Sequence, residues 1–182
     1  MRFYVRENMN IIQKLSDSNL FKKKITLSRY QYLSTESEIN TNIYFIESGS
    51  VRLFMRDGEE ERIIRFGYSG NIIVSLDSFL SDKPSGFYIQ AIKKTEIKVA
   101  SKKDFYEFIK SSNDHLKLWT SMLEDLVLQQ IDREKDLLIN SPKERYERVL
   151  KRSPQLFQEI PNKYIANYLR MSPETLSRLK KS

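Results

Sequence analysis

Short runs of β-branched and aromatic residues fill the chain from Ile25 to Ala100. The predicted strands are residues 43–46, 51–55, 62–66, 89–92 and 97–100. Runs of this length, bounded by turn-forming residues, are typical of antiparallel strands. The pattern therefore predicts an antiparallel β-roll or barrel.

Turn signals separate these runs. Asp57-Gly58 stands between two alternating runs, and both residue types tolerate the positive φ angles that a tight hairpin requires. A hairpin is therefore expected at this point. Gly49 and Gly70 mark further expected turns, although plain punctuation between strands is the alternative reading of both glycines.

The periodicity changes from two to between three and four after residue 112. The apolar positions Leu116, Trp119, Leu123 and Leu126 are spaced three and four apart, which predicts one long amphipathic helix over residues 113–140. The apolar seam lasts about two heptads before Gln130 and Arg133 interrupt it. Packing against the barrel and packing against a partner helix both remain open.

Asn140-Ser141-Pro142 ends this helix and caps another, which runs from Pro142 to about Arg152. That triplet is the expected hinge between domains. The predicted organisation is a β-roll domain over residues 1–112, a connecting helix over 113–140 and a C-terminal domain over 141–182. The fold class is α+β, and no internal repeat is present.

The C-terminal domain reads as two short helices joined by a tight turn. Ser172 supplies a hydroxyl cap, and Pro173 lacks the N–H that a first helical turn cannot use. Apolar residues spaced along both helices allow them to pack together, and these are Ile165, Leu169, Met171, Leu176 and Leu179, with the small Ala166 allowing close approach. This arrangement predicts a helix-turn-helix.

The second helix leaves a polar face outward because Leu176 and Leu179 point inward. Glu174, Ser177 and Arg178 are the expected base readers, since a guanidinium can bond guanine and a carboxylate can accept from cytosine. The residues expected to contact phosphates are Thr175, Lys163, Arg170, Lys180 and Lys181. A surface ion pair between Glu174 and Arg178 is the alternative reading of those two residues.

The distribution of charge also indicates a nucleic acid as the partner. Residues 140–182 hold ten Lys or Arg and four Asp or Glu, a net charge of +6, whereas residues 1–139 carry only +1. Nearly all the excess positive charge therefore lies in the part of the chain with the helix-turn-helix. This distribution is expected of a face that binds nucleic acid.

Composition restricts the classes of protein to which the chain can belong. The chain has no cysteine, and its only histidine, His115, is expected to serve packing or the surface, so no metal site or cofactor is expected. No run of about 18 apolar residues indicates a membrane span, and charged residues interrupt the segment 1–15. A cytoplasmic protein without enzymatic activity is expected, because no nucleophile or phosphate-cradling loop is recognisable.

The order of β-roll, long helix, hinge and helix-turn-helix resembles the family of the cyclic-AMP receptor protein and Fnr. The run from Ile43 to Phe54, the later Asp57-Gly58-Glu59 and Gly70 resemble the family's effector domain. The segment Glu174-Thr175-Leu176-Ser177-Arg178 resembles its recognition helix. The resemblance implies a homodimer joined through the long helix, with two recognition helices about 34 Å apart on a near-palindromic site.

The chain departs from the family pattern at several positions. Gly70-Asn71 stands where members that bind cyclic nucleotides have a glycine-glutamate pair, and Ser85 or its neighbours replace the phosphate-binding arginine. A buried phosphate would lack its cationic partner, so binding of cyclic AMP is not expected. Gly70, Asn71 and Ser85 remain ligand candidates, with ordinary loop chemistry as the favoured alternative.

Two further departures lie in the C-terminal domain. Arg170 takes a turn position where glycine is frequent in the family, at a cost of around 1 kcal/mol. Pro173 replaces a base-reading arginine of some members, so their operator sequence does not transfer. Little room remains between residues 152 and 161 for a wing hairpin.

The function expected from the sequence is a dimeric transcription regulator that binds specific duplex DNA. The effector is unknown, no membrane partner is expected, and contact with RNA polymerase is an open candidate. The alternative is a small-molecule sensor that acts through protein contacts without binding DNA.

Overall fold

The computed structural model describes residues 20–181. The strands are β1 (Lys23–Leu27), β2 (Tyr32–Ser34), β3 (Ile43–Ser48), β4 (Ser50–Asp57), β5 (Glu60–Tyr68), β6 (Ile72–Ile73), β7 (Tyr88–Ala91) and β8 (Thr95–Ala100). The helices are α2 (Leu76–Ser81), α3 (Lys102–Lys110), α4 (Asn113–Leu138), α5 (Pro142–Arg152), α6 (Leu156–Glu159), α7 (Asn162–Tyr168) and α8 (Pro173–Leu179). The segment 1–15 considered in the sequence lies outside the described residues.

Two antiparallel four-stranded sheets form the β-roll. Their strand orders are β1-β8-β3-β6 and β2-β7-β4-β5. Apolar side chains from both sheets fill the space between them, including Ile46, Val51, Ile89 and Ile97, which are fully buried. The predicted fold class, α+β with an antiparallel β-roll, is confirmed.

The predicted hairpin joins β4 to β5. Asp57 pairs with Glu60 at its tip, and Gly58 has a positive φ of 61°. Gly49 is required by the turn and does not merely separate two strands. Its φ is 92°, and a Cβ there would lie 2.4 Å from the carbonyl oxygen of Lys94. Only glycine fits such a position without strain.

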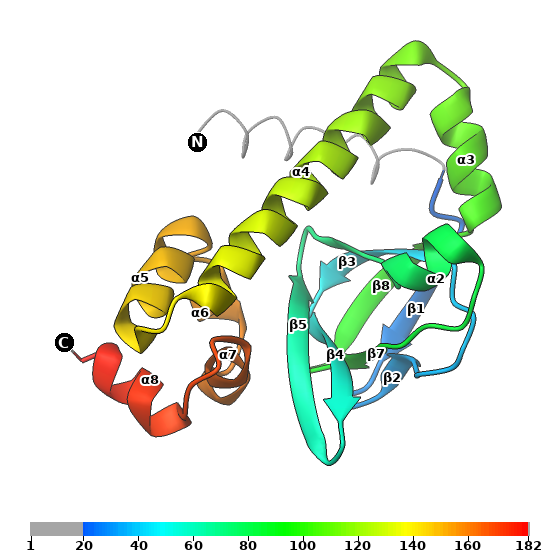
Figure 1. Ribbon diagram of the computed structural model, residues 1–182. Coiled ribbons are helices and arrows are strands. Elements are labelled where there is room, and N and C mark those ends of the chain that lie inside the picture. The colour runs from blue at the N-terminus through cyan, green and yellow to red at the C-terminus, as the bar shows by residue number, and fades with distance from the viewer. Residues whose placement is uncertain (1–19, 182) are drawn as a thin grey trace.

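The long helix α4 connects the roll to a compact group of four helices (Figure 1). Its first half packs on the roll, where Leu118, Trp119 and Met122 contact a cluster around Phe79 and Phe105. α5 begins at Pro142, and the hydroxyl of Ser141 accepts from the N–H of Glu144 at 3.3 Å. The helix expected after the hinge is therefore present with its expected cap.

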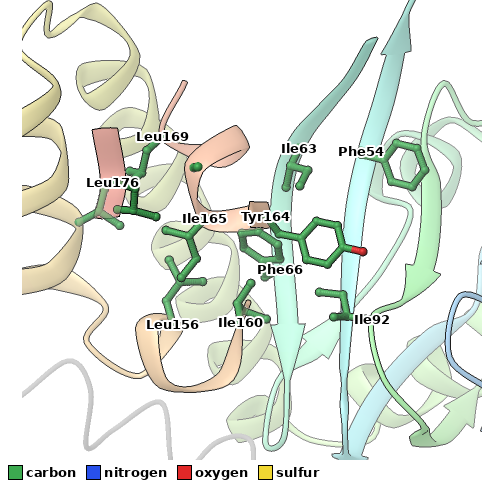
Figure 2. Packing of buried hydrophobic residues seen from close by; sticks show 12 residues of the cluster. Phe54, Ile63, Phe66, Ile92, Leu156, Ile160, Tyr164, Ile165, Leu169 and Leu176 are labelled. Carbon is green, nitrogen blue, oxygen red and sulfur yellow. The ribbon is translucent and has the colours of Figure 1, made fainter. Parts of the chain in front are cut away.

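The helix-turn-helix packs on the outer face of the roll. Figure 2 shows Tyr164 extending from α7 toward the strands that carry Phe54 and Ile63, while Leu169 and Leu176 lie among the C-terminal helices. β4 is buried on both faces as a consequence, since Val51 and Leu53 face the interior of the roll while Phe54 belongs to this outer cluster. Among the described residues, no strand follows β8, and α6 occupies the place where a wing hairpin would lie.

Candidate nucleic-acid interface

The second helix of the motif, α8, begins where its cap predicts. Its first residue is Pro173, and the Ser172 hydroxyl accepts a hydrogen bond from the N–H of Thr175 at 3.2 Å. Leu176 is fully buried against α5 and α7. The local sequence therefore fixes both the start of α8 and the face that it buries.

The opposite face of α8 is exposed. Glu174, Ser177 and Arg178 all lie on it. Within the described chain, Glu174 and Arg178 form no ion pair, and the Arg178 guanidinium lies 3.5 Å from the Thr175 hydroxyl instead. The two charged groups are thus beyond ion-pair distance, although the attraction to Arg178 contributes to the lowered pKa of the Glu174 carboxyl.

Nearby donors favour the ionised form of the Glu174 carboxyl. A hydrogen bond from its own backbone N–H, followed by one from the Ser172 hydroxyl, lowers the pKa of its carboxyl below the ordinary value. An ionised carboxylate accepts hydrogen bonds only. This side chain therefore suits an amino group such as cytosine N4.

The basic candidates divide into two groups. Arg170, Lys180 and Lys181 are exposed around the ends of α8, and the Lys180 ammonium donates to Asn162 Oδ1 at 2.8 Å. Lys163 lies elsewhere, because its ammonium is 4.6 Å from the ring centre of Tyr164 and 6.0 Å from that of Tyr30 in the roll. The structure thus does not bring Lys163 together with the other candidates.

Arg170 occupies the turn with a φ of 52°, so the chain uses a left-handed non-glycine residue there, as expected. Its carbonyl accepts from Nη2 of Arg145 at 3.1 Å, and the carbonyl of Leu169 accepts from Nε at 2.9 Å. Nη1 of the same arginine donates to the carbonyls of Ile139 and Asn140. Arg145 thereby ties the hinge to the turn of the motif.

Sequence reasoning missed Arg145 as a structural residue. It stands in a basic helix that otherwise reads as a solvated surface, and its partners are backbone carbonyls up to 25 residues away. No local signal marks such a residue. Arg145 becomes buried only in the tertiary structure, where carbonyls of the hinge and of the turn come together around it.

The ligand candidates Asn71 and Ser85 make hydrogen bonds within the roll. Gly70 has a φ of 83° in the turn between β5 and β6, and Asn71 Oδ1 accepts from the N–H of Tyr68 at 3.2 Å. The Ser85 hydroxyl and the Gly86 N–H both donate to the carboxylate of Asp77, at 3.0 Å and 2.9 Å. An internal carboxylate thus occupies the donors that a phosphate would use, which supports the loop reading of Ser85.

His115 lies in the first turn of α4. Its ring stacks on Phe108 with the ring centres 3.9 Å apart, and its backbone N–H donates to the Ser112 hydroxyl. Within residues 20–181, no group of three or more His, Cys, Asp or Glu side chains is placed to hold a metal ion. In the same part of the chain, no helix is long and apolar enough to cross a membrane.

Comparison with known proteins identifies the domain and the fold. Residues 24–112 match the family described as cyclic nucleotide-binding domain. No curated protein matches the chain in sequence. The segment that forms the β-roll is therefore similar to the domains of that family.

Solved structures extend the similarity to the whole described chain. A variant of CooA from Carboxydothermus hydrogenoformans is 16% identical with a TM-score of 0.74, and the match covers 94% of this chain and 82% of CooA. FixK2 from Bradyrhizobium japonicum is 18% identical with a TM-score of 0.69, over 87% of this chain and 82% of FixK2. The catabolite activator protein of Thermus thermophilus is 21% identical with a TM-score of 0.54, over 100% and 82% of the two chains.

These structures define the class to which the fold belongs. The chain has the fold of the Crp/Fnr family of transcription regulators, with its β-roll, long helix and helix-turn-helix in the same order. The resemblance that the sequence indicates is confirmed at this level. Identities of this size speak for the fold, and the DNA contacts of individual residues remain predictions.

Proposed function

We propose that this protein is a dimeric, sequence-specific DNA-binding transcription regulator. The observation that carries the proposal is the outward face of α8, where Glu174, Ser177 and Arg178 are exposed and the first and last are not paired with each other. A recognition helix must offer unpaired polar groups to the edges of bases. The family fold and the concentration of positive charge in residues 140–182 support the same conclusion.

Base reading is assigned to Arg178, Glu174 and Ser177. Arg178 would bond guanine through two N–H groups, Glu174 would accept from cytosine, and Ser177 would add a base or phosphate contact. Arg170, Thr175, Lys180 and Lys181 would position the protein on phosphates. Lys163 would join them only after the helix-turn-helix moves away from the roll, because its ammonium now lies 4.6 Å from the ring centre of Tyr164 and 6.0 Å from that of Tyr30.

Dimerisation is assigned to the outer face of α4. Exposed apolar side chains lie along it, and these are Leu116, Val127, Leu128, Ile131 and Leu138. Of the seam inferred from the sequence, Trp119, Leu123 and Leu126 instead line the side that faces the roll. A second copy of the helix would cover the outer stripe, which water otherwise contacts.

The mechanism follows from the way in which the helix-turn-helix is held. Carboxylates of the β4–β5 hairpin, Glu59 and Glu60, line a groove together with Arg170 and Ser172 at the start of α8. Glu60 is paired there with Arg62 at 2.5 Å, so the hairpin obstructs the approach of DNA to that end of the helix mainly by its position. A signal that shifts the population away from this docked arrangement would favour DNA binding.

Selection of bound duplexes from a random pool, followed by gel-shift titration, tests the proposal. The selected site should be near-palindromic, and Arg178→Ala should lose about 1–3 kcal/mol of discrimination at one base position of each half-site. Arg29→Ala removes an exposed arginine of the roll and serves as the matched control. Unchanged selectivity in Arg178→Ala would refute the role assigned to Arg178.

The alternative function is a sensor that acts through protein contacts. The observation that favours it is the tight packing of α7 on β5, through which the C-terminal helices serve as part of the core. Affinity for DNA that falls steeply with rising salt would favour the regulator, because neutralised phosphates release counterions. Partner binding that is independent of DNA and salt would favour the sensor.

A further inference from the structure

The carboxylate of Asp77 closes the loop that connects α2 to β7. It accepts hydrogen bonds from the Ser85 hydroxyl, at 3.0 and 3.1 Å, and from the N–H of Gly86 at 2.9 Å. These donors lie eight and nine residues further along the chain, so the contact joins two separate segments. The N–H of Ser78 donates to the same carboxylate at 2.8 Å. Among the described residues, no lysine or arginine lies within ion-pair distance of it, so neutral donors alone hold this charge.

Every polar group of Ser85 has a partner within the roll, where this residue is only 3% exposed. Its N–H donates to the carbonyl of Glu38 at 3.0 Å, and its carbonyl accepts from the N–H of Ser37 at 2.9 Å. Its hydroxyl accepts from the N–H of Phe87 at 3.1 Å and donates its one proton to Asp77. The hydroxyl therefore has no donor left for an external anion.

A hydroxyl and backbone N–H groups that converge on one point suit a small anion. Backbone N–H groups in turns commonly bind anions, and hydrogen bonds to a charged acceptor are roughly twice as strong as neutral ones. In this loop a side chain of the protein supplies the anion. A second anion at the same donors would be repelled by the Asp77 carboxylate and would find those donors already bonded.

The same contact fixes the beginning of α2, and an ion pair fixes its end. Asp82, the residue that follows the helix, is paired with Lys102 of the neighbouring α3 at 2.8 Å (Figure 1). Between the two ends, the Ser78 hydroxyl accepts from the N–H of Asn40 at 3.0 Å. The position of α2 is therefore defined by polar contacts along its length.

Phe79 connects α2 to α4. Its side chain is 1% exposed, and its ring centre lies 6.1 Å from that of Phe105 in α3 and 6.4 Å from that of Trp119 in α4. A fully buried ring cannot shift without moving its neighbours, because protein interiors are close-packed. The contacts that position α2 therefore also act on the first half of α4.

We infer that Asp77 is a built-in anion, which replaces an anionic effector at the loop of Ser85 and Gly86 and positions α2 and the first half of α4 without a bound molecule. The roll therefore keeps one arrangement in the presence and in the absence of cyclic nucleotides. A signal that controls DNA binding would have to act elsewhere on the molecule. This last consequence rests on the proposed function, whereas the role of Asp77 in the roll does not.

Removing the carboxylate and supplying it again from solution tests the inference. Asp77→Ala keeps a good helix former in α2 but leaves the donors of Ser85 and Gly86 unpaired, so the melting temperature should fall by about 3–10 °C. Formate, which replaces the lost carboxylate, should restore at least half of that loss in a saturable way. The emission of Trp119, the only tryptophan of the chain, should change in the variant and return with formate.

Matched variants separate this effect from the general action of salts and of helix ends. Asp114→Ala removes another aspartate from the first turn of a helix, with a side chain that is 91% exposed, and should gain no more from formate than the wild type. Asp77→Ala combined with Ser85→Ala should lose most of the rescue, because a donor is missing. Asp77→Asn keeps the shape and one acceptor, so it should fold and melt between the wild type and Asp77→Ala.

The wild type provides a measurement that needs no variant. Titration with cyclic AMP or inorganic phosphate at constant ionic strength should give no saturable change in the emission of Trp119, because Asp77 occupies the donors. A saturable change would overturn the inference. So would wild-type stability in both Asp77→Ala and Asp77→Asn, a loss that formate does not reverse, and equal rescue of Asp114→Ala.

Gel-shift titration of the same samples separates the two proposals. DNA binding by the wild type that requires cyclic AMP would overturn the role of Asp77 and leave the regulator intact. Rescue of Asp77→Ala by formate in a protein that does not bind DNA would refute the regulator and leave the role of Asp77 intact.

Discussion

Arg170 combines a left-handed backbone conformation with a proposed role in DNA binding. Its φ of 52° is unusual for a side-chain-bearing residue, and such a conformation costs roughly 1–2 kcal/mol. Its side chain is exposed beside the first turn of α8. The chain therefore keeps an arginine at a position where glycine would be less strained.

Arg170→Gly should raise the melting temperature and weaken DNA binding at the same time. The variant removes the left-handed strain, about 1 kcal/mol, and deletes the phosphate contact proposed for Arg170. Thermal unfolding and gel-shift titration measure the two effects. Ser37→Gly is the matched control, since Ser37 has a φ of 68° in the roll and should gain stability without a change in DNA affinity.

Arg145 connects the hinge to the turn of the helix-turn-helix and is the second residue for which we make a prediction. Replacing it with lysine keeps the charge but cannot satisfy carbonyls of the hinge and the turn together. Arg145→Lys should lower the free energy of unfolding by about 1–3 kcal/mol, because buried carbonyls lose their donors. Urea denaturation measures the loss, Arg56→Lys should change it little, and a loss below about 0.5 kcal/mol would contradict the role of Arg145.

At the scale of elements, α4 has two faces with different tasks. The side lined by Trp119, Met122 and Leu126 faces the roll, while Val127 and Ile131 are exposed. A helix buries one stripe against its own chain and needs a partner for a second apolar stripe. This division is the basis for the dimer that we propose.

Ile131→Glu should convert the dimer to a monomer with its fold retained. A carboxylate at the centre of the stripe would be buried without a partner in the dimer. Sedimentation velocity measures the molecular mass, and Leu80→Glu, at an exposed leucine of α2, should remain dimeric. A dimer of unchanged affinity in Ile131→Glu would move the interface elsewhere.

At the scale of the whole molecule, one asparagine side chain connects the two ends of the fold. Asn167 Oδ1 accepts from the N–H of Ile63 at 3.0 Å, and Nδ2 donates to the carbonyl of Glu61 at 2.8 Å. It therefore continues the hydrogen bonding of β5, the edge strand of its sheet. Arg52 of β4 adds to the contact between α7 and the roll, because its guanidinium lies 4.9 Å from the ring centre of Tyr164.

Asn167→Ala should loosen the docked helix-turn-helix without unfolding it. Each lost hydrogen bond is worth about 0.5–1.5 kcal/mol, so amide hydrogen exchange should accelerate in β5 and α7. Asn162→Ala, on the same helix but bonded to Lys180, is the control. Unchanged exchange in β5 would show that the apolar cluster alone holds the contact.

Much of this fold is local in origin. The alternating runs, the Asp57-Gly58 hairpin, the Ser141 and Ser172 caps and the burial of Leu176 follow from side-chain period and backbone preference, which short stretches of sequence contain. The exposed face of α8 follows from the same helical period. For these features the sequence alone was sufficient.

The tertiary structure decided the rest. Asn167 lies 104 residues from its partner Ile63, and the partners of Arg145 are carbonyls brought together by the hinge. Which stripe of α4 faces the roll, and that Phe79 packs against Trp119, also depend on how distant elements meet. A periodic pattern records neighbours within a turn or two of the chain, so contacts made across the fold leave no trace in it.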